Sequence, residues 1–190
     1  MTEKTLVLIK PDGVKKGIIG KILTRFEDTG LKIIAMKMIQ ADKKLAQNHY
    51  QLDEEWAKKL YERAKKTYEE QKKKLEYKDH MHMGKTIQER NMTFLTEGPV
   101  IALVLEAPHA IELIRKMIGH TEPRQALPGT IRGDFASTES YSISDSKSRS
   151  IRNLIHASDS VENASREISL WFSPKELYPN YKILHDFLIE

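Results

Sequence analysis

The sequence predicts an α+β protein, a ferredoxin-like sandwich whose four-stranded antiparallel sheet has the order βαββαβ, with helices on one face and a helical insertion. The first observation is the order of hydrophobic patterns, strand–helix–strand followed by a second strand–helix–strand, as in that motif. The second is the length of 190 residues, which favours a single domain over residues 1–190. The third is that two segments, one charged and one serine-rich, interrupt this pattern.

The first strand–helix–strand unit lies near the N-terminus. Residues 5–9 form a short apolar run with β character, and residues 10–13 (KPDG) are a turn signal, since proline fixes φ and glycine accepts positive φ. Residues 18–29 carry an apolar stripe with helical spacing, and Gly30 is placed to end that helix. Residues 31–39 are apolar enough for a buried strand.

The second unit occupies the C-terminal half of the chain. Residues 100–106 read as a buried strand, and residues 108–118 as a helix with Pro108 in its first turn. A short strand over 151–156 follows, and then a helix over 159–172. These two units together account for all four expected strands.

Two insertions are expected in this framework. Residues 51–97 form a charged helical insertion, in which 53–79 read as an amphipathic helix dense in Glu and Lys. Its apolar face consists of Ala57, Leu60, Tyr61, Ala64, Tyr68 and Leu75. Residues 136–150 form a second insertion, a serine-rich loop with seven serines between Ser137 and Ser150.

Composition excludes several classes of function. The net charge is +4, from 31 Lys and Arg against 27 Asp and Glu, and no segment is strongly basic, so a dedicated nucleic-acid-binding surface is not indicated. The absence of cysteine excludes disulfides, thiolate metal sites and cysteine nucleophiles, and it fits a cytoplasmic protein. No apolar run is long enough for a membrane helix and no signal-peptide pattern is present, so no membrane partner is expected.

Two short patterns suggest other sites but are weak. Gly20-Lys21 resembles the end of a P-loop, but Lys15 stands at the first glycine position and Ile22 replaces Ser or Thr. Residues 80–83 (HMHM) contain ligands that suit a soft metal such as Cu(I), although an ordinary exposed turn is the better interpretation of so short a stretch.

A stronger candidate site combines cations from separate elements with one histidine. Lys10, Arg115 and Arg132 each stand at or near the end of an expected element, and such groups bind phosphate oxygens. His156 ends a strand just before a helix, and a neutral imidazole can act as a nucleophile. Glu167 lies on the helix face that turns toward that strand, so it can orient the ring. Each residue alone is more often structural; their combination favours a phosphate site.

Four blocks of sequence resemble the nucleoside diphosphate kinase family. They are LVLIKPDGV (6–14), PGTIRGDF (128–135), NLIHASDS (153–160) and EISLWFSPKEL (167–177), in that order along the chain. The third block matches the family's active-site signature, Asn-x-x-His-[Gly/Ala]-Ser-Asp. The order and number of the blocks make the resemblance specific.

The resemblance implies a function and a set of site residues. His156 takes the γ-phosphoryl group of a nucleoside triphosphate such as ATP and passes it to a nucleoside diphosphate such as GDP, with ping-pong kinetics. Glu167 orients the histidine, and Ser158 and Tyr50 lie beside it. The phosphates and sugar are assigned to Lys10, Arg115, Thr121, Arg132 and Asn153. Mg²⁺ is expected through the nucleotide phosphates, with no metal ligand from the protein, and the chain is expected to form a homo-oligomer, a hexamer or tetramer.

Two points stay open at this stage. Both insertions lengthen the spacing between the matched blocks, and the first falls where the family supplies an aromatic side chain that stacks on the base. Ile87 or Gln88 occupies that position by counting back from Gly98, and Trp56 is a substitute, so the stacking residue is unassigned. The alternative function is a non-catalytic nucleotide- or nucleic-acid-binding module on the same fold.

Overall fold

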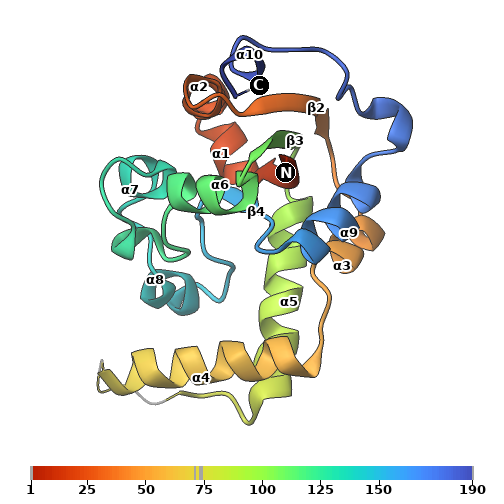
Figure 1. The fold of residues 1–190 in the computed structure, drawn as a ribbon. Helices are drawn as coiled ribbons and strands as arrows, with labels where there is room; N and C mark the ends of the chain where they lie inside the picture. Colours follow the sequence, from red (N-terminus) through yellow and green to blue (C-terminus); the bar gives the residue numbers. More distant parts are fainter. Residues whose placement is uncertain (1, 71, 73–74, 190) are drawn as a thin grey trace.

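The structure is a computed structural model that describes residues 2–70, 72 and 75–189. Its centre is a four-stranded sheet in the order β2-β3-β1-β4, in which all neighbouring strands are antiparallel (Figure 1). The strands are β1 (Thr2–Ile9), β2 (Lys32–Ile39), β3 (Val100–Pro108) and β4 (Ile155–Ala157). This topology confirms the predicted ferredoxin-like fold.

Alternate residues of β1 belong to two separate hydrophobic clusters, one on each face of the sheet. Val7 and Ile9 pack with α2 (Ile19–Asp28) and α6 (Ala110–Ile118). Leu6 and Leu8 pack on the opposite face with α3 (Lys43–His49) and α9 (Val161–Trp171). The expectation of helices on one face was therefore incomplete. Because β1 and β3 are apolar on both faces, both faces need a cover.

Two predicted boundaries were wrong for local reasons. Pro108 is the last residue of β3, not the first turn of α6, and His109 precedes that helix with a left-handed φ of 55°. β4 has only three residues, whereas a strand over 151–156 was expected. The left-handed conformation of Leu154, with φ of 68°, breaks extended structure just before β4 begins.

Short helices complete the body and its connections. The α-helices are α1 (Pro11–Lys15), α7 (Ile131–Phe135) and α10 (Asp186–Ile189). The 3₁₀ helices are η1 (Pro123–Gln125) and η2 (Pro174–Glu176). In the part of the chain that the structure describes, no helix is long and apolar enough to cross a membrane.

The charged segment forms a pair of helices rather than one. The helix predicted over 53–79 ends at residue 70, as α4 (Glu54–Glu70), and residues 71, 73 and 74 lie outside the described residues. A second helix, α5 (His80–Thr96), leads back to the sheet (Figure 1). It buries Phe94 and Leu95. Residues 80–83 were expected as an exposed turn but open this helix, because the Asp79 carboxylate caps it by accepting from His82 N at 2.8 Å.

The serine-rich segment is not simply a loop. It contains α8 (Tyr141–Ser146), and the Ser140 hydroxyl caps this helix by accepting from Ile143 N at 3.3 Å. Asp145 of α8 accepts hydrogen bonds from Arg90, at 2.9 Å, and from the Tyr68 hydroxyl. The two segments that interrupt the sheet are therefore in contact with each other.

Candidate active site

His156 lies on β4, on the face of the sheet that α9 covers, and it faces a carboxylate from that helix. Its Nε2 is 2.9 Å from Glu167 Oε2, and the same oxygen accepts a hydrogen bond from Ser158 Oγ at 2.6 Å. The Arg166 guanidinium donates to the other carboxylate oxygen at 3.3 Å. Glu167 is buried while His156 is partly exposed, so the carboxylate holds the ring from the protein interior.

This contact decides which ring nitrogen is available for chemistry. Because Nε2 of His156 donates to Glu167, the neutral ring has its lone pair on Nδ1. Burial raises the pKa of Glu167, but the charge of His156 and the hydrogen bonds from His156 and Ser158 outweigh it and hold that pKa at about 2. Glu167 is therefore ionised at neutral pH and keeps the His156 tautomer fixed.

A second histidine packs against the first. The rings of His49 and His156 meet edge to face with centroids 4.6 Å apart, and Trp171 Nε1 donates to His49 Nδ1 at 3.3 Å. Burial lowers the pKa of His49 well below its usual range, so this ring is neutral. Tyr50 contacts His49 with centroids 4.7 Å apart, and burial raises its pKa, so its hydroxyl is protonated.

Lys10, Asn153 and Thr121 form a chain of contacts beside the His156 strand. Lys10 follows the end of β1, and its Nζ donates to Asn153 Oδ1 at 2.6 Å. Asn153 Nδ2 in turn donates to the Thr121 carbonyl at 2.8 Å. Burial lowers the pKa of Lys10 to about 8, and the nearby Arg132 adds to this effect while Asp12 opposes it. This lysine therefore carries its charge at pH 7 but is poised to lose it above pH 8.

Arg132 is buried and ties α7 to two other segments, the end of α6 and the start of β4. Its Nε, Nη1 and Nη2 donate to the backbone carbonyls of Asn153, Gly119 and Ile155 at 3.2, 2.8 and 2.7 Å. These contacts use three of the five guanidinium N–H groups. Burial and the charge of Arg115 lower the pKa of Arg132 to about 10, so it remains charged at neutral pH.

The predicted site residues thus fall into an inner group and a rim. His156, Glu167 and Ser158 are hydrogen-bonded to one another, as are Lys10, Asn153 and Arg132 around the turn before β4. Tyr50 packs on His49, and His49 packs on His156. Arg115 and Thr121 have exposed side chains at the rim.

The positions of the three candidates, Ile87, Gln88 and Trp56, do not show which of them would stack on the base. Gln88 Nε2 donates to the Tyr50 carbonyl at 2.6 Å. Trp56 packs beside Gly84 in the contact between α4 and α5, and Ile87 is an aliphatic residue of α5. The stacking residue stays unassigned.

Two residues with a place in this site were missed in the sequence. His49 adjoins Tyr50, and the resemblance drew attention only to the tyrosine. Asp12 was interpreted only as part of a turn, yet its carboxylate accepts from Leu154 N at 3.0 Å, next to Asn153. Such contacts join residues far apart in the chain, so periodicity cannot reveal them.

The donor atoms near His156 bear on the expected metal. Among the described residues, one group of potential ligands comes together there, His49, His156 and Glu167, with ligand atoms within 4.8 Å of one another. Two imidazoles and one carboxylate suit a transition metal better than Mg²⁺, which prefers oxygen ligands. A magnesium ion carried by nucleotide phosphates needs no such cluster.

The sequence is similar to those of known nucleoside diphosphate kinases. A family model described as nucleoside diphosphate kinase matches residues 3–72 and 58–177. The chain belongs to the nucleoside diphosphate kinase family. Two members of the family, the nucleoside diphosphate kinases of Pyrobaculum aerophilum and Pyrococcus furiosus, are 39% and 43% identical to it. These alignments cover 92% and 93% of this chain and 97% and 86% of the relatives.

Solved structures of nucleoside diphosphate kinases share the fold. An NDP kinase from Pyrobaculum aerophilum superposes with a TM-score of 0.88 at 36% identity, covering 94% of this chain and 100% of that one. A transition-state mimic of the nucleoside diphosphate kinase from Borrelia burgdorferi, with bound vanadate and ADP, gives 0.78 at 37% identity. It covers 97% of this chain and 95% of that one.

Proposed function

We propose that the protein is a nucleoside diphosphate kinase that works through a phosphorylated His156. The observation that carries this proposal is the His156–Glu167 contact, which leaves Nδ1 of a partly exposed imidazole free. Lys10 and Arg132 are hydrogen-bonded around the turn that leads into the same strand. The relative from Borrelia burgdorferi binds vanadate and ADP as a transition-state mimic, which fits phosphoryl transfer at this fold. Membership of the family supports the same reaction.

The reaction proceeds in two matched halves. Nδ1 of His156 attacks the γ-phosphorus of a nucleoside triphosphate, the bond to the bridging oxygen breaks, and the nucleoside diphosphate leaves. A terminal oxygen of a second nucleoside diphosphate then attacks the phosphohistidine and regenerates His156. Glu167 and Ser158 keep the ring in its reactive tautomer, while Lys10, Arg115 and Arg132 balance charge on the equatorial oxygens.

The remaining proposed residues hold the nucleotide. Asn153 and Thr121 contact its phosphates and sugar, and Tyr50 packs behind the reacting histidine. When bound to the nucleotide phosphates, Mg²⁺ would supply positive charge that neutralises part of theirs. Lys10 and Asn153 would meet the phosphates that carry the ion, and the mainly cationic lining suits a metal held by phosphate oxygens rather than by carboxylates.

The decisive test is formation of a phosphoenzyme. After incubation with γ-labelled ATP and Mg²⁺, the wild-type protein should carry an acid-labile label that disappears on addition of GDP. The His156→Ala variant should carry none, since the nucleophile is gone. Ser158→Ala is the matched control, because it keeps the nucleophile and should still be labelled.

Equal labelling of wild type and His156→Ala would refute the mechanism. The alternative, a non-catalytic nucleotide- or nucleic-acid-binding module, predicts nucleotide binding without label in any variant. Binding to nucleic acid by such a module should also weaken steeply with salt.

Three further features belong to this proposal. Residues 1–190 form one kinase domain with insertions at 51–97 and 136–150.

The chain assembles as a homo-oligomer, a hexamer or a tetramer. The exposed side chains of Met36 and Met38 on edge strand β2 support contact between copies. The protein works in the cytoplasm, in keeping with its lack of cysteine.

A further inference from the structure

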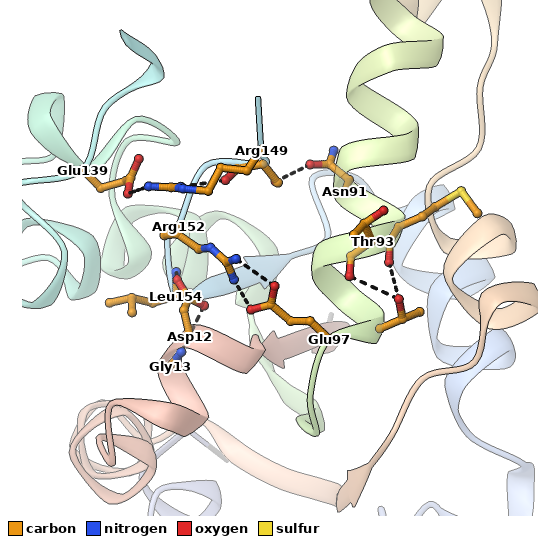
Figure 2. Close-up of polar contacts among 12 residues, drawn as sticks. Asp12, Gly13, Asn91, Thr93, Glu97, Glu139, Arg149, Arg152 and Leu154 are labelled. Atoms are coloured by element: carbon orange, nitrogen blue, oxygen red, sulfur yellow. Dashed lines mark hydrogen bonds and ion pairs between the residues drawn. The ribbon is translucent and has the colours of Figure 1, made fainter. Parts of the chain in front are cut away.

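The segment that leads into β4 is held from several sides by polar contacts (Figure 2). Arg149 donates to Glu139 at 2.8 Å, and Ser150 Oγ donates to Asn91 of α5 at 2.5 Å. The Arg152 guanidinium makes a two-pronged ion pair with Glu97 at the end of α5. The segment carries Asn153, so its path determines where that amide stands.

Asp12 holds the residue that directly follows Asn153. Its Oδ2 accepts from Leu154 N at 3.0 Å and its Oδ1 accepts from Gly13 N at 3.0 Å, so both oxygens are bound to backbone (Figure 2). Asp12 is partly buried, and the charges of Lys10 and Arg152 act on it. A carboxylate with both oxygens occupied in this way is suited to fix a backbone rather than to move a proton.

The backbone that Asp12 holds has an unfavourable conformation. Leu154 is left-handed, with φ of 68°, which costs free energy for a residue with a side chain. The turn is also closely packed, because a Cβ on Gly13 would lie 3.0 Å from the Leu154 carbonyl oxygen. Lys10 N donates to that carbonyl at 2.8 Å, which closes the turn from the other side.

Asp12 therefore affects how Asn153 and Lys10 stand relative to each other. The Leu154 amide that it accepts from follows Asn153 directly, and Asn153 Oδ1 receives the 2.6 Å hydrogen bond from Lys10 Nζ. If the turn relaxed toward ordinary φ values, the Asn153 side chain would rotate away from Lys10. The cation and the amide would then no longer face a nucleotide together.

We propose that Asp12 is a positioning residue of the nucleotide site, which sets Asn153 against Lys10 by holding Leu154 in its left-handed turn. The inference rests on the proposed function for the identity of the ligand, a nucleoside diphosphate or triphosphate. Asp12 itself touches neither the phosphates nor His156. Its effect reaches the ligand through Asn153.

The test is a double-mutant cycle measured by binding. The affinity for Mg·ADP is measured by calorimetry for wild type, Asp12→Asn, Asn153→Ala and the double variant. Asparagine keeps the size of the side chain, but its amide group must face one of the two N–H donors. We expect a roughly tenfold weaker Kd for Asp12→Asn, the effect of losing one hydrogen bond to a charged group. In the Asn153→Ala background the same change should have no further effect.

Asp79→Asn is the matched control. Asp79 also accepts a backbone N–H, at the start of α5, and it belongs to none of the site contacts. Its Kd for Mg·ADP should equal that of the wild type. Asp12→Ser serves as a second variant if Asp12→Asn does not fold, since a serine cannot reach Leu154 N and should weaken binding in the same way.

The phosphoenzyme assay separates positioning from loss of structure. At saturating ATP, Asp12→Asn should be labelled to within about twofold of wild type, because His156, Glu167 and Ser158 are untouched. A reduced labelled fraction with an unchanged Kd would mean a structural role and would overturn the proposal. So would an equal loss of affinity with and without Asn153, which would indicate that Asp12 acts through the charge of Lys10 alone. Since the cycle uses binding only, it remains decisive even if no variant forms a phosphoenzyme.

Discussion

Lys10 illustrates how burial changes the behaviour of a single side chain. A lysine at the surface titrates near 10.4, but desolvation of this one lowers its pKa to about 8. The charge is kept at neutral pH because the Asn153 side-chain oxygen accepts from it and Asp12 lies nearby. A residue that the sequence offers as a plain cation is thus a group whose charge depends on pH just above the physiological range.

Nucleotide capture should consequently fail at alkaline pH. Lys10 is charged below its pKa and neutral above it, so kcat/KM for ATP should fall as pH rises through about 8. A full pH–rate profile checks this. Lys10→Arg supplies the control, since arginine does not titrate in this range. Whatever its absolute rate, that variant should lose the alkaline decline. A decline at the same pH in both proteins would assign it to another group.

At the scale of elements, α5 connects the two segments that the sheet pattern does not explain. Its Arg90 donates to Asp145 of α8 at 2.9 Å, and Tyr68 of α4 donates to the same carboxylate. Further along α5, Asn91 accepts from Ser150 at 2.5 Å. These contacts hold the serine-rich segment in a defined structure, and its amino-acid composition alone could not predict them.

Removing the Asp145 carboxylate should therefore destabilise the protein. Asp145→Ala leaves Arg90 and the Tyr68 hydroxyl without their acceptor, and both Asp145 and Arg90 are less than a third exposed. We expect the free energy of unfolding to fall by about 1–3 kcal/mol in urea denaturation. Glu112→Ala, which removes an exposed ion pair with Lys116, should lower the free energy of unfolding much less, because water and salt screen a pair at the surface. Equal effects of the two variants would show that the Asp145 contacts do not matter for stability.

At the scale of the molecule, β2 is an edge strand: among the described residues β3 is the one strand paired with it, although Tyr178 N donates to the Ile34 carbonyl at 2.7 Å. Its solvent-facing side chains include Met36 and Met38, with exposed fractions of 55% and 58%. β4, at the opposite edge, has three residues and carries His156. One edge of the sheet thus bears the candidate chemistry and the other is the better candidate for contact between copies.

Light scattering should detect that contact. We expect the wild-type protein to have four or six times the mass of a single chain. Replacing Met36 and Met38 with aspartate should reduce that mass by placing charge in an apolar contact. Met81→Asp, at an exposed methionine on α5, should leave it unchanged. A wild-type protein with the mass of one chain would contradict the proposed assembly.

Much of this molecule could be predicted from local signals. Continuous apolar runs predicted the central strands, helical periodicity predicted α2, α6 and α9, and the NLIHASDS block identified His156. The helix predicted over 53–79 was partly correct, because its apolar face is real but the chain turns back before His80. Pattern reasoning works in these places because each pattern reflects burial of neighbours in the sequence.

The sequence by itself determined the βαββαβ order, the family and the residue types available for phosphoryl transfer. Only the tertiary structure decided which of these residues meet. In it, Glu167 faces Nε2 of His156, and Arg132 donates three hydrogen bonds to backbone carbonyls. Asp12 holds the turn before β4. The physical reason is the separation along the chain of the residues that interact. Periodicity records which face of an element is buried. A hydrogen bond depends on the atomic positions of two groups that can be more than a hundred residues apart, as Lys10 and Asn153 are.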